Sequence, residues 1–358
     1  MSENVPPEAG SDRATSGLRL GWLCSYTPVE LLTAAGFQAT RLAGGAGHDA
    51  RARTVLPAAL CPYLKSCLGA ALDGAAGELT GVVLATGCDG LRRLADVWAH
   101  YGPGDVYVLD VPRRRDPPAL VYFQTELRAL AGWLAQLSGR ALDEKALRSA
   151  IDRHNETRHL LARLDERRQA GWPIPATEIL ALVDRWGEEE PATLNRRLAG
   201  LLAEPSPSTL PATGVPIVLS GNILAPADRF VLGLVEAAGA RIASDDLCSG
   251  MRAVLGEVAV GPDPYVALAQ RYLERTPCPR CDDPADRFAQ IAQLCQSTGA
   301  RGVIYASQKF CDGSLYDFGP LREHLEAAGV HVLLLELDAT AVMPGQARTR
   351  IEAFLETL

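Results

Sequence analysis

The stretch Gly302-Val303-Ile304-Tyr305-Ala306, with Lys309-Phe310-Cys311-Asp312-Gly313 close behind it, decides the fold. Its first half is an apolar run typical of a buried strand. An amphipathic helix follows and ends at Ala327-Ala328-Gly329, where the glycine supplies the left-handed conformation that commonly stops a helix. The next apolar run, His331 to Leu335, predicts another strand. Strand, helix and strand in this spacing indicate a parallel α/β unit.

The same punctuation occurs at two earlier places in the chain. Ala34-Ala35-Gly36 and Ala237-Ala238-Gly239 also close amphipathic helices. Further strands are expected at the apolar runs 18–23, 81–85, 106–109, 216–219 and 241–243. These strands gather in two regions, and the apolar residues of 122–204 between them have helical spacing.

The pattern predicts an α/β fold with two Rossmann-like parallel-sheet lobes joined by a helical segment. Two domains also follow from the length of 358 residues, because single cores usually stop growing at roughly 250–300 residues. The Pro/Ser run from Pro205 to Pro211 is the predicted boundary. We expect a disordered tail at 1–16, an N-terminal α/β lobe at 17–125, a helical segment and linker at 126–211, and a C-terminal α/β lobe at 212–358.

Composition and charge restrict the class of protein. The chain is 47% hydrophobic and 22% charged, which is ordinary for a globular protein, and its formal net charge is −8. An acidic chain without a long run of lysine or arginine is a poor ligand for nucleic acid. No apolar run approaches the roughly 18 residues that cross a bilayer, and no signal peptide is visible. We therefore expect a cytoplasmic protein that binds neither nucleic acid nor membrane.

Nine cysteines carry most of the functional information. Their odd number and the lack of an export signal argue against a disulfide framework and favour metal binding or simple burial. Cys24, Cys88, Cys248 and Cys311 each follow a predicted strand. Ligands of parallel α/β sheets bind outside the carboxyl ends of the strands, so thiols from both lobes are expected to converge on one cleft.

Cys61 has a different position, because it stands directly before Pro62. Proline is typical of the first helical residue, which makes Cys61 the N-cap, where the helix end favours a thiolate or an anionic cluster. The tripeptide Cys-Asp-Gly follows a strand at both Cys88 and Cys311, an echo between the two lobes. Burial of each cysteine as a small hydrophobic residue stays an open alternative.

Other site signals are weak. The sequence has no Walker A motif and no Gly-x-Gly-x-x-Gly between a strand and a helix, so no nucleotide site is predicted. The only C-x-x-C motif, Cys278-Pro279-Arg280-Cys281, has no second pair at a spacing typical of zinc sites. This pair has three interpretations: accessory ligands, a redox pair or inert loop residues.

Several short motifs, in this order along the chain, resemble those of the 2-hydroxyacyl-CoA dehydratase family, which also contains the benzoyl-CoA reductase subunits without ATPase activity. The resemblance covers about residues 18–358. The matching motifs are Gly21-Trp22-Leu23-Cys24-Ser25-Tyr26-Thr27-Pro28-Val29-Glu30, Leu60-Cys61-Pro62-Tyr63-Leu64-Lys65-Ser66, Gly87-Cys88-Asp89, Asp245-Asp246-Leu247-Cys248, Lys309-Phe310-Cys311-Asp312 and the tail from Gly345 to Phe354.

The resemblance implies an iron–sulfur cluster, usually of the 4Fe-4S type, whose three cysteine ligands match Cys61, Cys88 and Cys311. One iron would then lack a cysteine and stay open, as a Lewis acid or an electron-transfer site requires. One branch of the family holds a double-cubane cluster with more cysteines. The less favoured additional ligands here are Cys24, Cys67, Cys278 and Cys281, and Cys67 departs from the small residue that relatives often have there.

The resemblance also implies partners and a reaction. Family members work as pairs of related subunits, here a homologous second subunit or a homodimer, and an ATP-dependent activator with its own iron–sulfur cluster supplies a low-potential electron. In the dehydratases a ketyl radical of the acyl-CoA substrate expels the 2-hydroxyl group. We expect a subunit of a radical 2-hydroxyacyl-CoA dehydratase. The alternatives are a subunit of a benzoyl-CoA-type aromatic-ring reductase or a double-cubane small-molecule reductase, and a non-catalytic electron-relay subunit.

Overall fold

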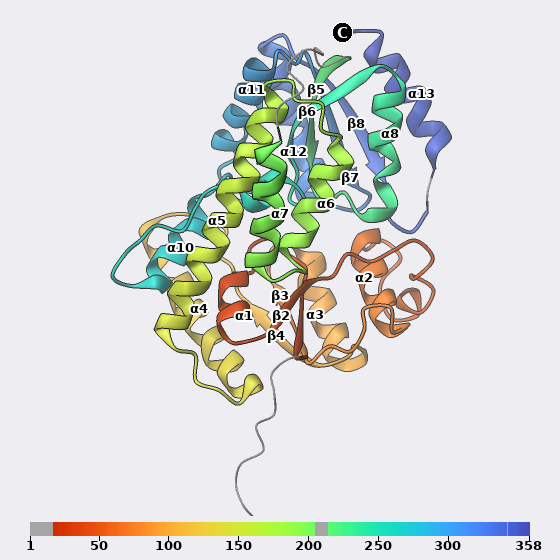
Figure 1. Cartoon of the computed structure of the whole chain (residues 1–358). Helices are drawn as coiled ribbons and strands as arrows, with labels where there is room; N and C mark the ends of the chain where they lie inside the picture. The colour runs from red at the N-terminus through yellow and green to blue at the C-terminus, as the bar shows by residue number, and fades with distance from the viewer. Residues whose placement is uncertain (1–16, 205–213, 342) are drawn as a thin grey trace, which may run out of the picture.

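The computed structural model describes residues 17–204, 214–341 and 343–358. The tail predicted at 1–16 and the boundary predicted from Pro205 to Pro211 lie outside these residues. The described chain forms two parallel sheets, one in each half of the sequence, with helices packed around both (Figure 1). The predicted α/β fold with two Rossmann-like lobes is therefore confirmed.

The first sheet contains β1 (Arg19–Trp22), β2 (Gln38–Arg41), β3 (Gly81–Ala85) and β4 (Asp105–Leu109), in the order β2-β1-β3-β4. All of its pairings are parallel. β3 is buried along its whole length because both faces of the sheet are covered. Val82 and Leu84 pack with α2 (Pro62–Leu72) and α3 (Asp89–Tyr101), whereas Val83 and Ala85 pack with α1 (Val29–Ala34) and α4 (Pro117–Ser138).

The second sheet contains β5 (Val215–Gly221), β6 (Ala240–Asp246), β7 (Gly302–Gln308) and β8 (His331–Leu337), in the order β6-β5-β7-β8. Its pairings are also parallel. Counted within each half, the strand order is the same in both sheets: second, first, third, fourth. One face packs against α8 (Phe230–Ala237) and α13 (Pro344–Leu355), and the other against α11 (Ala285–Thr298) and α12 (Asp312–Ala327).

The segment between the sheets is helical, as its periodicity predicts. It contains α4, α5 (Glu144–Gln169), α6 (Ala176–Trp186) and α7 (Pro191–Ala203). The last three pack side by side and run alongside both lobes (Figure 1). The remaining elements are α9 (Met251–Val254), α10 (Pro264–Glu274) and the short 3-10 helices η1 (Ala52–Thr54) and η2 (Pro226–Asp228). We keep the domain limits 17–125, 126–211 and 212–358 as a proposal.

Helix α5 is joined to both lobes by buried ion pairs. Near its middle, Arg158 pairs with Glu30 of α1, and the Glu30 carboxylate also accepts a hydrogen bond of 2.8 Å from Tyr272. Near its end, Arg168 lies 2.8 Å from Asp245 at the end of β6. Because breaking a buried pair leaves an uncompensated charge, these contacts hold α5 in one position against both sheets. The separation between the two sheet edges is thereby restricted.

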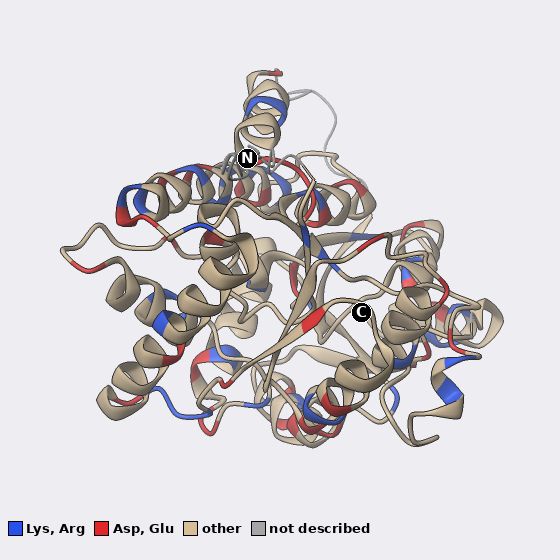
Figure 2. Cartoon of the chain, turned by 90° about the horizontal axis from the view of Figure 1, so that it is seen from below, with Lys and Arg blue, Asp and Glu red and all other residues tan. Residues whose placement is uncertain are grey.

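The outer helices carry charges of both signs, as Figure 2 shows. Among the described residues, no helix combines the length and the apolar composition that a membrane span needs.

Candidate functional site

In each sheet the winding of the chain reverses between the first and third strands, β1/β3 and β5/β7. Such a switch point leaves a crevice at the carboxyl ends of the strands, where ligands of open α/β sheets bind. Cys24 follows β1, Cys88 follows β3 and Cys311 follows β7, while Asn222 follows β5. Three of the four cysteines predicted at strand ends therefore follow strands that flank a switch point, whereas Cys248 follows the edge strand β6.

Cys61, Cys88 and Cys311 share one local geometry, because each is the N-cap of a helix. They precede α2, α3 and α12, respectively, and Pro62 begins α2 as predicted. The first-turn N–H groups of a helix have no partner within it, and its positive end favours negative charge. Each of these three thiols is thus held at a helix end that suits an anionic group.

The three thiols lie close enough for their charges to interact. Burial raises the pKa of Cys61, and the thiols of Cys311 and Cys88 raise it further. Cys311 likewise adds to the effect of burial on the pKa of Cys88. The backbone N–H groups of Leu64 and Ser314, in the first turns of two of these helices, partly oppose the shifts. Thiols that resist ionisation side by side become good ligands only when a metal group compensates their charge.

Two of the less favoured ligands, Cys24 and Cys278, belong to the same surroundings. The thiol of Cys278 interacts electrostatically with those of Cys24, Cys88 and Cys311. The loop that carries Cys278 also lies against the first turn of α12, since a Cβ added to Gly313 would lie 3.9 Å from the loop's backbone. The structure therefore brings these five thiols from both lobes to one region, and the thiol of Cys248 also interacts with that of Cys24.

The other two less favoured ligands, Cys67 and Cys281, have different partners. Cys67 is buried on α2, where its thiol donates a hydrogen bond of 3.6 Å to the carbonyl oxygen of Leu42. The Cys281 sulfur lies 3.4 Å from the hydroxyl of Tyr26. The two cysteines of the C-x-x-C motif thus differ in the atom that lies at this hydroxyl, which is the sulfur in Cys281 and the backbone N–H in Cys278.

Tyr26 organises the C-x-x-C loop, a role that sequence reasoning missed. Its hydroxyl accepts the N–H of Cys278 at 3.4 Å, and the guanidinium groups of Arg275 and Arg280 lie over its ring, 4.4 and 4.5 Å from the centroid. Burial raises the pKa of Tyr26, so the hydroxyl stays protonated and keeps these contacts. The only sequence signal was its place two residues after Cys24.

Two buried cations, Lys65 and Arg280, lie beside the cysteines without a carboxylate partner among the described residues. Each is 6% exposed. Lys65 is one helical turn after Cys61 and donates to the carbonyl oxygen of Ala58, and Arg280 is close enough to Cys24 and Cys278 to interact with their thiols. A buried charge is costly unless an opposite charge offsets it. An anionic group among the thiols would offset both cations.

These features fit an iron–sulfur cluster. Thiolates are its usual ligands, and helix N-termini and cations stabilise its negative charge. Within the described part of the chain, no three His, Cys, Asp or Glu side chains converge closely enough to hold a single metal ion. A 4Fe-4S cluster makes a different demand, since its thiolates bind separate irons.

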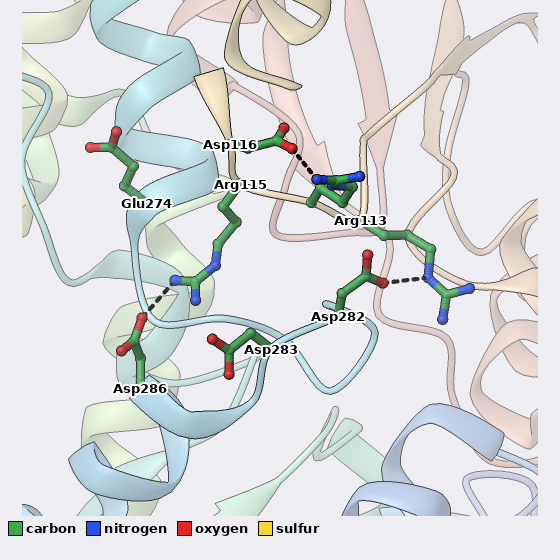
Figure 3. A pocket seen from close by; sticks show the side chains of 8 residues that line it. Arg113, Arg115, Asp116, Glu274, Asp282, Asp283 and Asp286 are labelled. Carbon is green, nitrogen blue, oxygen red and sulfur yellow. Dashed lines mark ion pairs between the residues drawn. The ribbon is translucent and has the colours of Figure 1, made fainter. Parts of the chain in front are cut away.

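A hollow of about 710 Å³ is lined in part by Asp282 and Asp283, the two residues that follow the C-x-x-C motif (Figure 3). It is lined by three consecutive arginines and five acids: Arg113, Arg114, Arg115, Asp116, Glu274, Asp282, Asp283 and Asp286. Each arginine is paired with an acid: Arg113 with Asp282 at 3.8 Å, Arg114 with Asp116 at 2.6 Å and Arg115 with Asp286 at 2.9 Å. Because acids outnumber arginines here, we assign this hollow no anionic ligand.

Comparisons with known proteins agree over nearly the whole chain. The family described as 2-hydroxyglutaryl-CoA dehydratase, D-component, matches residues 24–358. The lactoyl-CoA dehydratase subunit beta of Anaerotignum propionicum is 26% identical over 95% of this chain and 91% of that protein. The (R)-phenyllactyl-CoA dehydratase beta subunit of Clostridium sporogenes is 25% identical over the same shares. A benzoyl-CoA reductase subunit of Thauera aromatica is 25% identical over 83% of this chain and 80% of that protein.

Proposed function

The chain belongs to the 2-hydroxyglutaryl-CoA dehydratase D-component family, and from this premise we propose that it is an iron–sulfur subunit of a radical 2-hydroxyacyl-CoA dehydratase. The proposed reaction eliminates water from a 2-hydroxyacyl-CoA after the input of one low-potential electron. The observation that carries the proposal is the set of three interacting thiols, Cys61, Cys88 and Cys311, at helix N-termini from both lobes. Relatives named as dehydratase beta subunits support the same class of reaction.

In this proposal Cys61, Cys88 and Cys311 hold a 4Fe-4S cluster. The cluster supplies an iron without a protein ligand, which has Lewis-acid and electron-transfer capacity. The chain contributes the first-turn N–H groups of α2, α3 and α12, together with Lys65 and Arg280, which reduce the cost of burying negative charge. Cys61 and Cys311 are partly buried residues, whereas Cys88 is the most exposed residue of the three, although its thiol is desolvated by its neighbours.

The proposal includes partners. A homologous second subunit, or a second copy of the chain, would cover the Cys88 side and exclude water, which strengthens electrostatic interactions at the site. Support comes from the relatives named beta subunits, whose names imply a companion subunit. An ATP-dependent activator with its own iron–sulfur cluster would supply the electron, an acyl-CoA would be the substrate, and the cytoplasm is the proposed location.

Iron content tests the ligand assignment. Protein purified without air should contain about four irons per chain if the cluster is 4Fe-4S. Changing Cys61, Cys88 or Cys311 to Ala should remove most of that iron. Cys295→Ala is the matched control, because Cys295 lies on the buried face of α11, is 2% exposed, and belongs to a core cluster that contains no other cysteine. Wild-type iron content in all three ligand variants would overturn the assignment.

One observation favours a second candidate, a double-cubane reductase on the same fold. A larger cluster needs more ligands, and Cys24 and Cys278 lie beside the three favoured thiols. In that case Cys24→Ala and Cys278→Ala should each lose about half of the iron. The dehydratase proposal predicts instead that both variants, and Cys278→Ala/Cys281→Ala, keep their iron and their visible spectrum. Cys281→Ala is the control for the loop, because the Cys281 thiol contacts Tyr26.

Turnover separates the remaining functions. The purified subunit, its partner and the activator should dehydrate a 2-hydroxyacyl-CoA in the presence of ATP. Reduction of benzoyl-CoA without dehydration would support the aromatic-ring reductase, a function named by one relative. Turnover that needs this chain for electron delivery, while the substrate binds only to the partner subunit, would assign this chain a relay role.

A further inference from the structure

The turn that leads from β7 to Cys311 has an unusual backbone. The N–H of Cys311 donates to the carbonyl oxygen of Gln308 at 3.2 Å, which closes a four-residue turn with Lys309 and Phe310 at its centre. Phe310 has φ 58°, and it is the only residue other than glycine with positive φ among the described residues. Turn positions of this kind favour Gly or Asn, because a larger side chain is strained there. A bulky aromatic residue is therefore held in a conformation that it does not prefer.

The surroundings impose this conformation from the strand side of the turn. Gln308 is fully buried. Its backbone N–H donates to Asn222 at 3.2 Å, its side-chain nitrogen donates to Asp228 at 2.5 Å, and its side-chain oxygen accepts from Ala339 at 3.2 Å. Strained backbone persists only where neighbouring contacts determine it, and it concentrates at functional sites. The turn is therefore fixed at its first residue, Gln308, and continues into α12, with Cys311 at the start of that helix.

The ring of Phe310 reaches across to the other lobe. The ammonium nitrogen of Lys65, on α2, lies 5.9 Å from the centre of that ring, within the range of a cation–π contact. Phe310 itself is 49% exposed, whereas Lys65 is 6% exposed. Lys65 is bonded into the first turn of α2, since its backbone N–H donates to the carbonyl oxygen of Cys61 at 3.2 Å. One contact thus joins the neighbour of Cys311 to the helix that Cys61 caps.

Glycine at position 310 would form the same turn at a lower conformational cost. A ring that is half exposed to water contributes little to the core, so its contact with Lys65 is the gain that offsets the strain. We propose that Phe310 is a positioning residue: its left-handed backbone directs Cys311 to the site, and its ring, held by Lys65, latches the Cys311 turn to the Cys61 helix. The inference rests on the proposed function, because it concerns two of the three assigned ligands.

The test separates the ring from the backbone. Phe310→Gly removes the ring and permits the turn, Phe310→Ala removes the ring and keeps the strain, and Phe310→Tyr keeps both. Lys65→Met removes the cation from the other side of the contact, and Lys65→Arg restores it. Two control variants change a nearby lysine and a nearby aromatic ring that do not take part in the Phe310–Lys65 contact. They are Lys309→Met, whose lysine pairs with Asp338, and Tyr316→Ala, whose ring is 84% exposed on α12.

Two measurements that do not depend on enzyme activity test the position of Cys311. The first is the rate at which iodoacetamide alkylates Cys311 and Cys61 in iron-free protein, followed by mass spectrometry of the peptides. The second is iron content and the electron paramagnetic resonance spectrum of the reduced, anaerobically purified protein. Phe310→Gly and Lys65→Met should both raise the alkylation rate of Cys311 several-fold and change the spectrum. Phe310→Tyr, Lys65→Arg and both controls should match the wild type.

Phe310→Ala should melt at a lower temperature than Phe310→Gly, because only Ala retains the strained conformation. Equal or higher melting of the Ala variant would refute the backbone part of the proposal. Wild-type alkylation rates and spectra in Phe310→Gly and Lys65→Met would refute the latch, and if one of them does not fold, the other decides. A wild type without iron would overturn the proposed function, while the alkylation rates of iron-free protein would still decide the latch.

Discussion

His154 should make the protein sensitive to mild acid. It lies on α5, is 2% exposed, and accepts the indole N–H of Trp186 on Nδ1 at 3.0 Å. Because that indole can only donate, Nδ1 carries no proton, and Nε2 donates to the hydroxyl of Thr33 at 2.9 Å. The buried ring is therefore neutral, and a second proton would face the indole N–H.

The direction of the effect follows from the pKa of His154. Burial, with a smaller contribution from Arg158 that Glu30 opposes, lowers the pKa from 6.5 to about 4. Between these values the unfolded chain binds a proton that the folded chain does not, so stability is present above about pH 6.5 and is lost as the pH falls towards about 4. At about pH 5 the pH lies roughly 1.5 units below 6.5. Each unit corresponds to about 1.36 kcal/mol, so the free energy of unfolding should fall by about 2 kcal/mol.

Urea unfolding of iron-free protein at about pH 7 and about pH 5 measures this loss. His154→Gln keeps an acceptor and a donor but cannot titrate, so its loss between the two pH values should be about 2 kcal/mol smaller than in the wild type. His159→Gln makes the same substitution at an exposed histidine of the same helix and is the control for the substitution itself. If His154→Gln loses as much stability as the wild type, the assignment of a buried neutral histidine is wrong.

Four further predictions concern the buried ion pair, the cluster and the partner subunit. Burial alone would raise the pKa of Glu30, but Arg158 and its neighbours together lower it to about 2, so its contribution to stability should persist above about pH 4.5 and disappear towards about pH 2 in acid titrations. Arg158→Met, which leaves that carboxylate buried alone, should cost about 3–5 kcal/mol in urea unfolding, and a loss below about 1 kcal/mol would contradict the pairing. Air should bleach the visible absorption of the anaerobic protein, and an unchanged spectrum after hours would support complete protein ligation. Sedimentation of the co-expressed subunits should give a dimer, and an active monomer would contradict the partner proposal.

The sequence predicts the strands well where they are apolar. β3 and the first five residues of β7 are hydrophobic runs because helices cover both of their faces, and both strands were expected at these places. β2 was not expected, since its four residues, Gln38–Arg41, are mostly polar and it lies at the edge of the sheet. Its pairing with β1 depends on partners that no local pattern reveals.

The thiols at strand ends were also predictable, but the charges around them were not. Lys65 and Arg280 are ordinary surface residue types, and only the tertiary structure shows that both are buried beside cysteines. The pairing of Glu30 with Arg158 joins residues that are 128 positions apart, which periodicity cannot detect. Sequence spacing likewise groups Cys278 with Cys281, whereas the fold directs one thiol towards the site and the other to Tyr26.

The strand order that both sheets share explains why Cys-Asp-Gly occurs once in each lobe, at Cys88 and at Cys311. Cys88 follows the third strand of the first sheet and Cys311 follows the third strand of the second, so the two are equivalent positions in two copies of one topology. The position after the first strand differs between the lobes, because it holds Cys24 after β1 and Asn222 after β5. The Asn222 side chain hydrogen-bonds the Cys311 thiol and thereby lowers its pKa. A site built from two such lobes is therefore asymmetric in its thiols. The position held by Asn222 offers no thiolate to the proposed cluster, which agrees with the proposal that one iron lacks a cysteine ligand.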